Sequence, residues 1–120
     1  MRILLIDAGG FIGGLLLARL RYDGFTTRAL SRRPTPPLRL ADEVIIETLS
    51  PASDFAALLR GVDSVIHLAD GFNAYEQLPL SAMHDEAAVR LETAWKLAHA
   101  AAATGTDFIY LIPTCIIIDL

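Results

Sequence analysis

The sequence has few of the residues that build covalent or metal-based sites. Its 120 residues include one cysteine, Cys115, which excludes an internal disulfide and a Cys-x-x-Cys metal site. Only 20% of the residues are charged, so a disordered, highly charged arm is also excluded. The net charge of −4 argues against a general polyanion-binding surface, although Arg28, Arg32, Arg33 and Arg39 form a local basic segment. We therefore expect no nucleic-acid partner.

Long hydrophobic runs are missing as well. The two longest apolar stretches, residues 11–18 and 108–118, are shorter than the ~20 residues that span a bilayer. The first residues, Met1-Arg2-Ile3, lack the architecture of a signal peptide. These absences predict a cytoplasmic protein without a membrane partner. Hydrophobic residues nevertheless make up 53% of the chain, so residues 1–120 are expected to form a single domain around one large core.

Short apolar runs alternate with helical patterns along the chain. The predicted strands cover residues 2–6, 25–30, 44–46, 62–68 and 108–112, and the predicted helices cover residues 11–22, 50–61 and 81–104. Residues 31–41 contain three prolines and are expected to form a loop. Nearly all-apolar strands that alternate with helices form a parallel sheet covered on both faces. The sequence thus predicts an α/β fold, a doubly wound, Rossmann-like sheet of about five strands in the order 3-2-1-4-5.

The predicted helices carry apolar faces and end signals. In the first helix, Ile12, Leu16 and Leu20 recur every four residues and are expected to face the sheet. Ser50, followed by a proline, is expected to cap the second helix. The expected apolar face of the long helix consists of residues 87, 91, 94, 98 and 101. Glu92 and Lys96 are spaced as a favourable ion pair on its other side, and Trp95 is expected to pack.

A glycine-rich turn follows the first strand. In a doubly wound sheet, ligands bind beyond the carboxyl ends of the strands, where the strand order reverses beside the first strand. Gly9 and Gly10 permit close backbone approach, and Gly13 lets the helix press against the strand. The free N–H groups at the helix N-terminus can bind a phosphate. The turn is therefore a candidate nucleotide site, although glycines also serve simply to make turns.

Four segments, in order, resemble the N-terminal part of one enzyme family. Residues 6–13, I-D-A-G-G-F-I-G, are similar to the T-G-x-x-G-F-I-G loop of the NAD(P)-dependent epimerase/dehydratase family, the extended short-chain dehydrogenase/reductases. Residues 28–33 resemble its second strand, residues 59–69 its L-x-G-V-D-x-V-I-H-L-A-A segment, and residues 104–110 the run into its fifth strand. The resemblance implies redox chemistry on a nucleotide sugar or a similar small carbonyl or hydroxyl substrate. Complete members are more than twice as long, so we expect a truncated NAD(P)-binding domain.

The resemblance also implies which residues bind the dinucleotide. They are Ala8, Gly9, Gly10, Phe11, Ile12, Gly13, Arg32, Arg33, Leu49, Leu68 and Ala69. Arg32 and Arg33 follow the second strand, where an acidic residue would bind the ribose 2′-hydroxyl and an arginine would accommodate a 2′-phosphate. NADP is therefore favoured over NAD. The alternative is that the two arginines form a solvated turn.

Two carboxylates depart from the family pattern. Asp7 replaces the first glycine of the loop, and two like charges within ~4 Å at an effective dielectric of ~20 repel by a few kcal/mol. We therefore expect weakened affinity for the pyrophosphate. Asp70 replaces the second alanine of the family's Leu-Ala-Ala, and the pair could hold Mg²⁺ or share a proton. A surface or capping role for one of them is favoured, so no metal site is assigned.

The family's catalytic pair is missing from these 120 residues. Family members use Tyr-x-x-x-Lys, in which the lysine lowers the pKa of the tyrosine. None of the three tyrosines has a lysine four residues later, because the only lysine, Lys96, follows Glu92 at that spacing. In the fifth strand the family's catalytic Ser/Thr falls on Pro113, beside Thr114. We assign no catalytic residue, and expect His67, in a buried strand, to be a satisfied core histidine.

Two hypotheses follow from these observations. In the first, the chain is the dinucleotide-binding domain of an epimerase/dehydratase-type oxidoreductase, inactive alone, which meets its small-molecule substrate only with the missing C-terminal part. In the second, it is a non-catalytic remnant of the fold with lost or weakened cofactor binding, and acts as a partner- or cation-binding module. Self-association through exposed apolar surface is compatible with both.

Overall fold

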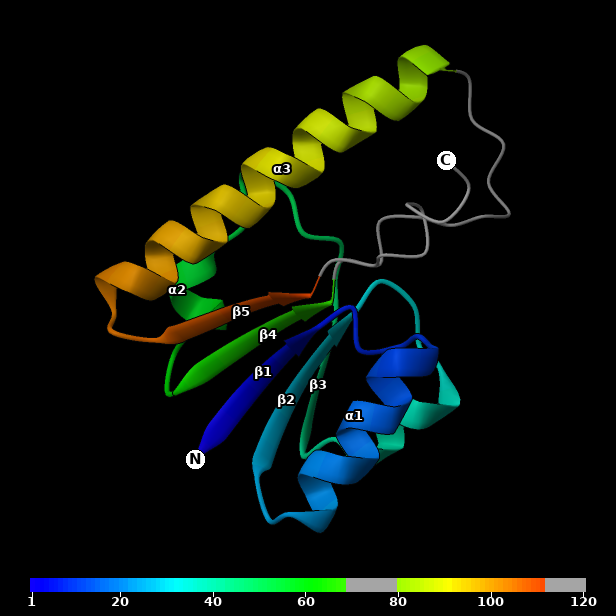
Figure 1. Cartoon of the computed structure of the whole chain (residues 1–120), viewed down its shortest axis with the longest axis vertical. Coiled ribbons are helices and arrows are strands. Elements are labelled where there is room, and N and C mark those ends of the chain that lie inside the picture. Colours follow the sequence, from blue (N-terminus) through cyan, green and yellow to red (C-terminus); the bar gives the residue numbers. More distant parts are fainter. Residues whose placement is uncertain (69–79, 112–120) are drawn as a thin grey trace.

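Five parallel strands form the central sheet of the protein, which is described here from a computed structural model (Figure 1). The structure describes residues 1–68 and 80–111, with the backbone alone for residues 80–87. The strands are β1 (Arg2–Ile6), β2 (Thr26–Ser31), β3 (Glu43–Ile46), β4 (Ser64–Leu68) and β5 (Asp107–Leu111). Their order is β3-β2-β1-β4-β5, and every neighbouring pair is parallel. The predicted fold class and strand order are confirmed.

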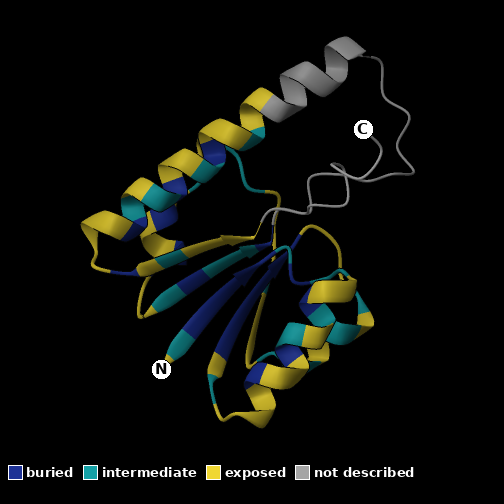
Figure 2. Ribbon diagram, viewed as in Figure 1, coloured by how far each residue is buried: buried dark blue, intermediate teal, exposed yellow. Residues whose placement is uncertain are grey.

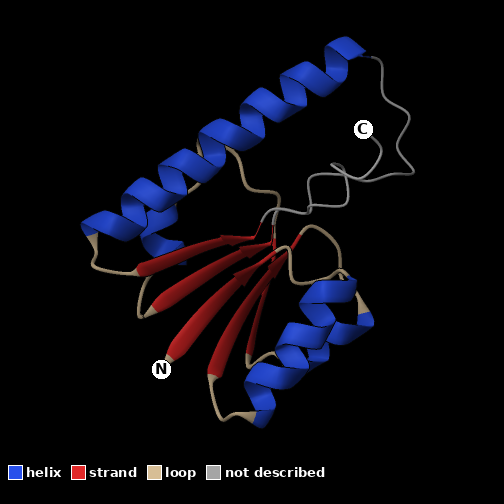
Figure 3. Cartoon of the chain, viewed as in Figure 1, coloured by secondary structure: helices blue, strands red, loops and turns tan. Residues whose placement is uncertain are grey.

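Helices cover both faces of the sheet (Figure 3). Helix α1 (Phe11–Tyr22) and the 3₁₀ helix η1 (Pro36–Leu40) lie on one face, and helices α2 (Phe55–Leu58) and α3 (Leu80–Ala103) lie on the other. Residues 31–41 were expected to be a loop, and η1 corrects that expectation. The two prolines that open η1 have a backbone angle already suited to a helical first turn.

Strand β1 is buried along most of its length (Figure 2). Its side chains alternate between two apolar clusters. Leu4 and Ile6 point into the cluster beneath α2 and α3, while Leu5 points into the cluster beneath α1. All three are almost completely buried. A strand buried on both faces has no polar positions, which is why residues 2–6 read as one continuous apolar run.

Helix α1 buries Leu20 as expected, but the other residues on its buried face differ from the expected ones. Its buried residues are Gly13, Leu17 and Leu20, whereas Ile12 is 58% exposed and Leu16 is only half-buried. The helix is apolar on most of its circumference, so a count of apolar residues alone does not identify the buried side. The glycine on the inner side decides the register, because it lets the helix axis approach the sheet.

Helix α3 also differs from the expected pattern. Thr93, Leu97 and Ala101 face the core, while Leu91 is 73% exposed and Trp95 is 64% exposed. Trp95 packs at the outer surface, where it stacks on His99 with ring centroids 4.9 Å apart. The predicted pair is present, with Lys96 Nζ 3.5 Å from Glu92 Oε1. Among the described residues, no helix is long and apolar enough to cross a membrane.

Helix α2 begins later than the sequence suggested. Its N-cap is Asp54, whose Oδ1 accepts a hydrogen bond of 3.1 Å from the Ala57 N–H. Ser50 instead belongs to a preceding turn, in which its hydroxyl accepts from the Ala52 N–H. Burial of Phe55 against the core explains the later start, because the helix must present that side chain to the sheet.

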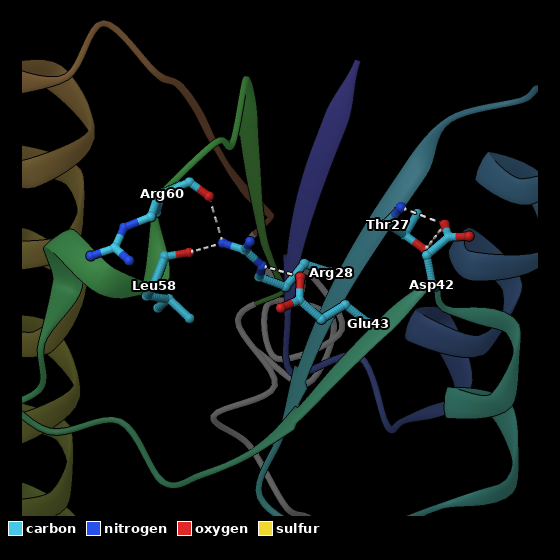
Figure 4. A network of polar contacts seen from close by, with 6 residues as sticks. All are labelled: Thr27, Arg28, Asp42, Glu43, Leu58 and Arg60. Carbon is cyan, nitrogen blue, oxygen red and sulfur yellow. Dashed lines mark hydrogen bonds and ion pairs between the residues drawn. The ribbon is translucent and has the colours of Figure 1, made fainter.

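Arg28 corrects the expectation of a uniformly basic segment. The residue is 7% exposed, and its guanidinium lies between β3 and the end of α2 (Figure 4). Nε donates to Glu43 Oε2 at 2.6 Å, and Nη1 donates to the carbonyls of Leu58 and Arg60 at 2.7 and 2.9 Å. Arg28 is thus an internal clamp of the fold, and the exposed arginines of that segment are Arg32, Arg33 and Arg39.

Candidate functional site

The turn that joins β1 to α1 lies at the switch point of the sheet. Strand β1 pairs with β2 on one side and β4 on the other. Helix α1, which follows β1, lies on one face of the sheet, and α3, the next described element after β4, lies on the other, so the elements after these two strands diverge to opposite faces (Figure 1). Such a divergence leaves a ligand position beyond the carboxyl ends of the two strands. Residues 7–10 lie next to that ligand position.

Asp7 adopts a backbone conformation that favours glycine. Its φ is 62°, and it is the one non-glycine residue with positive φ in the described part of the chain. The left-handed conformation costs an ordinary L-residue roughly 1–2 kcal/mol, although aspartate tolerates it better than most residues. The geometry therefore gives a physical reason for the glycine that the resemblance led us to expect at this position. The first residue of the turn carries a backbone strain and a carboxylate that a glycine would lack.

Gly13 presses α1 against the end of β1, as predicted. A Cβ atom at Gly13 would lie 2.3 Å from the Ala8 carbonyl oxygen, which is far inside contact distance. Ala8 is itself buried, and its N–H donates to the Leu30 carbonyl at 3.0 Å. The turn is therefore held between β2 and the first turn of α1, with no room for a larger residue at position 13.

The N-terminus of α1 is the open part of the turn. Gly10 is the N-cap residue of α1 and has no side chain that could cap the helix. The first turn contains no acidic residue, so none of its side chains offsets the positive end of the helix dipole. Phe11 and Ile12 are 82% and 58% exposed and thus leave the helix end accessible. A phosphate group could be bound by the free N–H groups of this turn.

The hydroxyl groups of Ser31, the last residue of β2, and of Thr35 lie against the glycine turn. The sequence pattern did not predict these contacts. The Thr35 hydroxyl donates to the Gly9 carbonyl at 3.0 Å. A Cβ atom at Gly9 would lie 2.4 Å from the Ser31 hydroxyl and 3.0 Å from that of Thr35. Gly9 is thus required for close packing rather than for an unusual φ. A Thr between two prolines gives no sequence signal for such a contact.

The remaining predicted cofactor residues fall into two groups. Arg32 and Arg33 are exposed beside the glycine turn, where the Ser31 hydroxyl donates to the Arg33 carbonyl at 2.8 Å. Leu68 is buried in the α1-side cluster, and Leu49 packs against the cluster on the other face. Both leucines therefore contribute to the core. Ala69 lies outside the described residues.

His67 lies near the carboxyl end of β4, but its environment is not the satisfied one expected. It is half-buried and packs against Tyr110 and Phe108 of β5, with ring centroids 4.8 and 6.4 Å away. Within the described part of the chain, its buried Nδ1 has no hydrogen-bond partner. Burial lowers the pKa of His67 below its ordinary value of 6.5, because imidazolium is poorly solvated there. The ring is therefore neutral at physiological pH.

The structure describes only some of the residues considered as metal ligands or as counterparts of the family's catalytic residues. Among the described residues, no group of three or more His, Cys, Asp or Glu side chains could hold a metal ion. Asp70, the expected partner of Asp7, lies outside those residues, as do Pro113 and Thr114. The described site is therefore defined by a glycine turn, a helix N-terminus and an arginine pair.

A parallel sheet of this order with a glycine turn at its switch point defines a Rossmann-type α/β domain. The family model for the NAD dependent epimerase/dehydratase family matches residues 3–117. The chain therefore belongs to that family. A comparison with curated proteins finds no significant match.

Solved structures with this fold include several sugar-nucleotide enzymes. A short-chain dehydrogenase/reductase superfamily protein from Agrobacterium tumefaciens, solved with bound NAD, is 25% identical, with a TM-score of 0.69 over 92% of this chain and 32% of its own. MoeE5, in complex with UDP-glucuronic acid and NAD, is 24% identical, with a TM-score of 0.72 over 92% of this chain and 36% of its own. The UDP-N-acetylglucosamine 4-epimerase of Bacillus cereus is 23% identical, with a TM-score of 0.67 over 92% of this chain and 34% of its own. The chain thus spans about a third of the length of these proteins.

Proposed function

We propose that the chain is a dinucleotide-binding domain whose ligand is NAD or NADP. The observation that carries the proposal is the contact between Gly13 and Ala8, because it brings the open N-terminus of α1 to the switch point of the sheet. In that position the free N–H groups of the first turn would bind the diphosphate, and Gly9 and Gly10 would let it approach the backbone. When bound, the nicotinamide would supply hydride transfer.

We further propose a preference for NADP. Arg32 and Arg33 are exposed beside the turn, where two guanidinium groups would pair with a 2′-phosphate. The carboxyl end of β2 carries the buried Ser31 rather than a carboxylate, so no acidic side chain is provided there for a free ribose 2′-hydroxyl.

Asp7 opposes the ligand that the rest of the turn favours. A carboxylate near the diphosphate adds a repulsion of a few kcal/mol at an effective dielectric of ~20. We therefore expect affinity to be weak and to be recovered when the carboxylate is removed. The arrangement also supports the second hypothesis, a fold remnant with weakened cofactor binding.

The experiment is a calorimetric titration of the protein with NADPH and NADH. We expect millimolar affinity for the unmodified chain and an affinity at least about tenfold higher for Asp7→Gly, which corresponds to about 1.4 kcal/mol or more. Asp23→Gly, the same change at the other end of α1, is the matched control and should leave affinity unchanged. If neither the unmodified chain nor Asp7→Gly binds either cofactor at millimolar concentration, the remnant hypothesis replaces the proposal.

The reaction itself we assign to a larger assembly. Redox chemistry on a nucleotide sugar or a related carbonyl or hydroxyl compound would need an acid-base pair that these 120 residues lack. The chain alone should therefore show no turnover with NAD(P)H and such a substrate. Measured turnover would show that the assignment is wrong. A cytoplasmic location remains a prediction from the sequence.

A further inference from the structure

Thr35 uses its hydroxyl in an unusual way for its place in the chain. It is the N-cap residue of η1, a position where threonine commonly caps its own helix. Its side chain makes no such cap. The hydroxyl instead donates to the Gly9 carbonyl, 26 residues away in sequence, at 3.0 Å. The contact joins the segment after β2 directly to the glycine turn.

The segment that carries Thr35 is fixed on both sides of this contact. Pro34 and Pro36 flank it, and a residue before proline is restricted to extended backbone, which is the conformation Thr35 has, with φ −134° and ψ 154°. Leu38 then anchors η1 in the α1-side core cluster. Pro37 of η1 lies against α1, since a Cβ atom at Gly14 of α1 would lie 3.0 Å from the Pro37 Cβ. Thr35 is therefore a rigid point of attachment.

Two hydrogen bonds fix the backbone around Arg32 and Arg33, and the second of them also reaches the glycine turn. At one end, the Ser31 hydroxyl donates to the Arg33 carbonyl at 2.8 Å. At the other end, Thr35 holds the Gly9 carbonyl. The backbone of this short turn is thus tied to the glycine turn, while both arginine side chains are exposed and free of internal packing.

We propose that Thr35 is a positioning residue that fixes the Arg32–Arg33 turn beside the glycine turn and thereby sets selectivity for a 2′-phosphorylated dinucleotide. The inference rests on the proposed function, because it assumes that a dinucleotide binds here. Guanidinium groups recognise phosphate through a fork of paired hydrogen bonds, which demands a fixed backbone. A dinucleotide without the 2′-phosphate makes no use of that fork, so its affinity should not depend on Thr35.

The test compares Thr35→Val, which keeps the shape of the side chain and removes the hydroxyl, with Thr35→Ser, which keeps the hydroxyl. The matched control is Thr26→Val, an exposed threonine at the opposite end of β2. Calorimetry with NADP⁺ and NAD⁺, in the Asp7→Gly protein, gives the ratio of the two affinities. We expect Thr35→Val to lower the NADP⁺/NAD⁺ ratio about tenfold, Thr35→Ser to restore it and Thr26→Val to leave it unchanged.

Other outcomes separate the two levels of the argument. An equal loss for both cofactors, or an unchanged ratio, would overturn the positioning role while leaving dinucleotide binding intact. Absence of binding in every variant would instead overturn the proposed function, and the selectivity role with it. Amide hydrogen exchange of residues 9, 32, 33 and 35 tests the attachment without any ligand. Thr35→Val should accelerate exchange there at least about tenfold, and unchanged exchange would show that the hydroxyl does not hold the turn.

Discussion

The guanidinium of Arg28 and the carboxylate of Glu43 form an ion pair of 2.6 Å between the adjacent strands β2 and β3. The pair is asymmetric, because the arginine side chain is buried and that of Glu43 is half-exposed. A second nitrogen of the guanidinium, Nη1, donates to the carbonyls of Leu58 and Arg60 at the end of α2. One side chain therefore connects β2, β3 and the α2 region. Arg28 therefore satisfies carbonyls that would otherwise be left unpaired beneath the sheet.

Removal of this side chain should destabilise the domain. We expect Arg28→Met to lower the free energy of unfolding by about 2–4 kcal/mol, since buried acceptors lose a charged donor. Arg28→Lys should be intermediate, because an ammonium cannot reproduce the fork. Urea denaturation gives the values, and Arg60→Met is the matched control, since Arg60 contributes its backbone carbonyl and its exposed side chain is dispensable. Equal effects of the Arg28 and Arg60 substitutions would contradict the role assigned to Arg28.

The contact between α1 and the end of β1 leaves no room for a methyl group. We expect Gly13→Ala to destabilise the protein by about 1–3 kcal/mol, because the added Cβ would meet the Ala8 backbone and overpack the turn. Gly14→Ala is the neighbouring control, where the nearest atom belongs to the Pro37 side chain. Its effect should stay within about 1 kcal/mol, because alanine also favours the helix. Thermal unfolding of the two variants measures the difference, and a stable Gly13→Ala protein would refute the close approach.

His67 should make stability depend on pH near neutrality. Burial lowers its pKa in the folded protein, whereas in the unfolded chain it titrates near 6.5. Between these values the unfolded chain binds more protons, so stability rises with pH in this window. As far as His67 is concerned, the free energy of unfolding is highest above about pH 6.5 and decreases as the pH falls toward the pKa of His67 in the folded protein.

Denaturation midpoints between pH 7.5 and 5.5 measure this effect. We expect His67→Gln to flatten the profile relative to the unmodified protein. His99→Gln, on the exposed side of α3, is the control and should preserve the slope. A slope that survives the loss of His67 would assign the titration to another group.

The outer sides of both long helices expose large apolar residues. On α1 they include Leu15 and Tyr22, and on α3 they include Leu91 and Trp95. Large apolar side chains exposed on a helix can promote association. We expect concentration-dependent self-association in sedimentation equilibrium, weakened about tenfold or more by a charged pair of substitutions on the helix responsible. Comparison of Leu91→Lys/Trp95→Lys with Leu15→Lys/Tyr22→Lys identifies that helix, and a monomer at all concentrations would exclude both.

The fold was predictable because its signals are repeated along the chain. Five short strands, most of them rich in apolar residues and each followed by a glycine or proline break, indicate the parallel sheet independently of any one residue. Helix registers were not predictable in the same way. In α1 the buried face includes Gly13, which carries no hydrophobic signal, so the apolar pattern placed Leu20 correctly but Ile12 wrongly. In the α2 region, Ser50, Ser53 and Asp54 all suit a cap, and only burial of Phe55 selects Asp54.

In the candidate site, too, some contacts could be predicted from the sequence and others could not. The role of Gly13 followed from the motif, because close helix–strand approach is what a glycine at that spacing permits. The contacts of Ser31 and Thr35 with Gly9 did not follow, since they join segments whose spacing in sequence carries no periodic signal. The inward position of Arg28 was also hidden, because one charged residue in an apolar strand reads as an exposed one.

The place of β1 in the middle of the sheet has a consequence for synthesis on the ribosome. Ile3 pairs with Thr27 on one side and with Ser64 on the other, so β1 receives its second neighbour about sixty residues after it is made. Until then one edge of an apolar strand has no partner, and pairing over such sequence distances is slow. Unpaired apolar edges are the surfaces that chaperones protect in growing chains. The period of greatest exposure to misassembly therefore ends only when β4 has left the ribosomal tunnel.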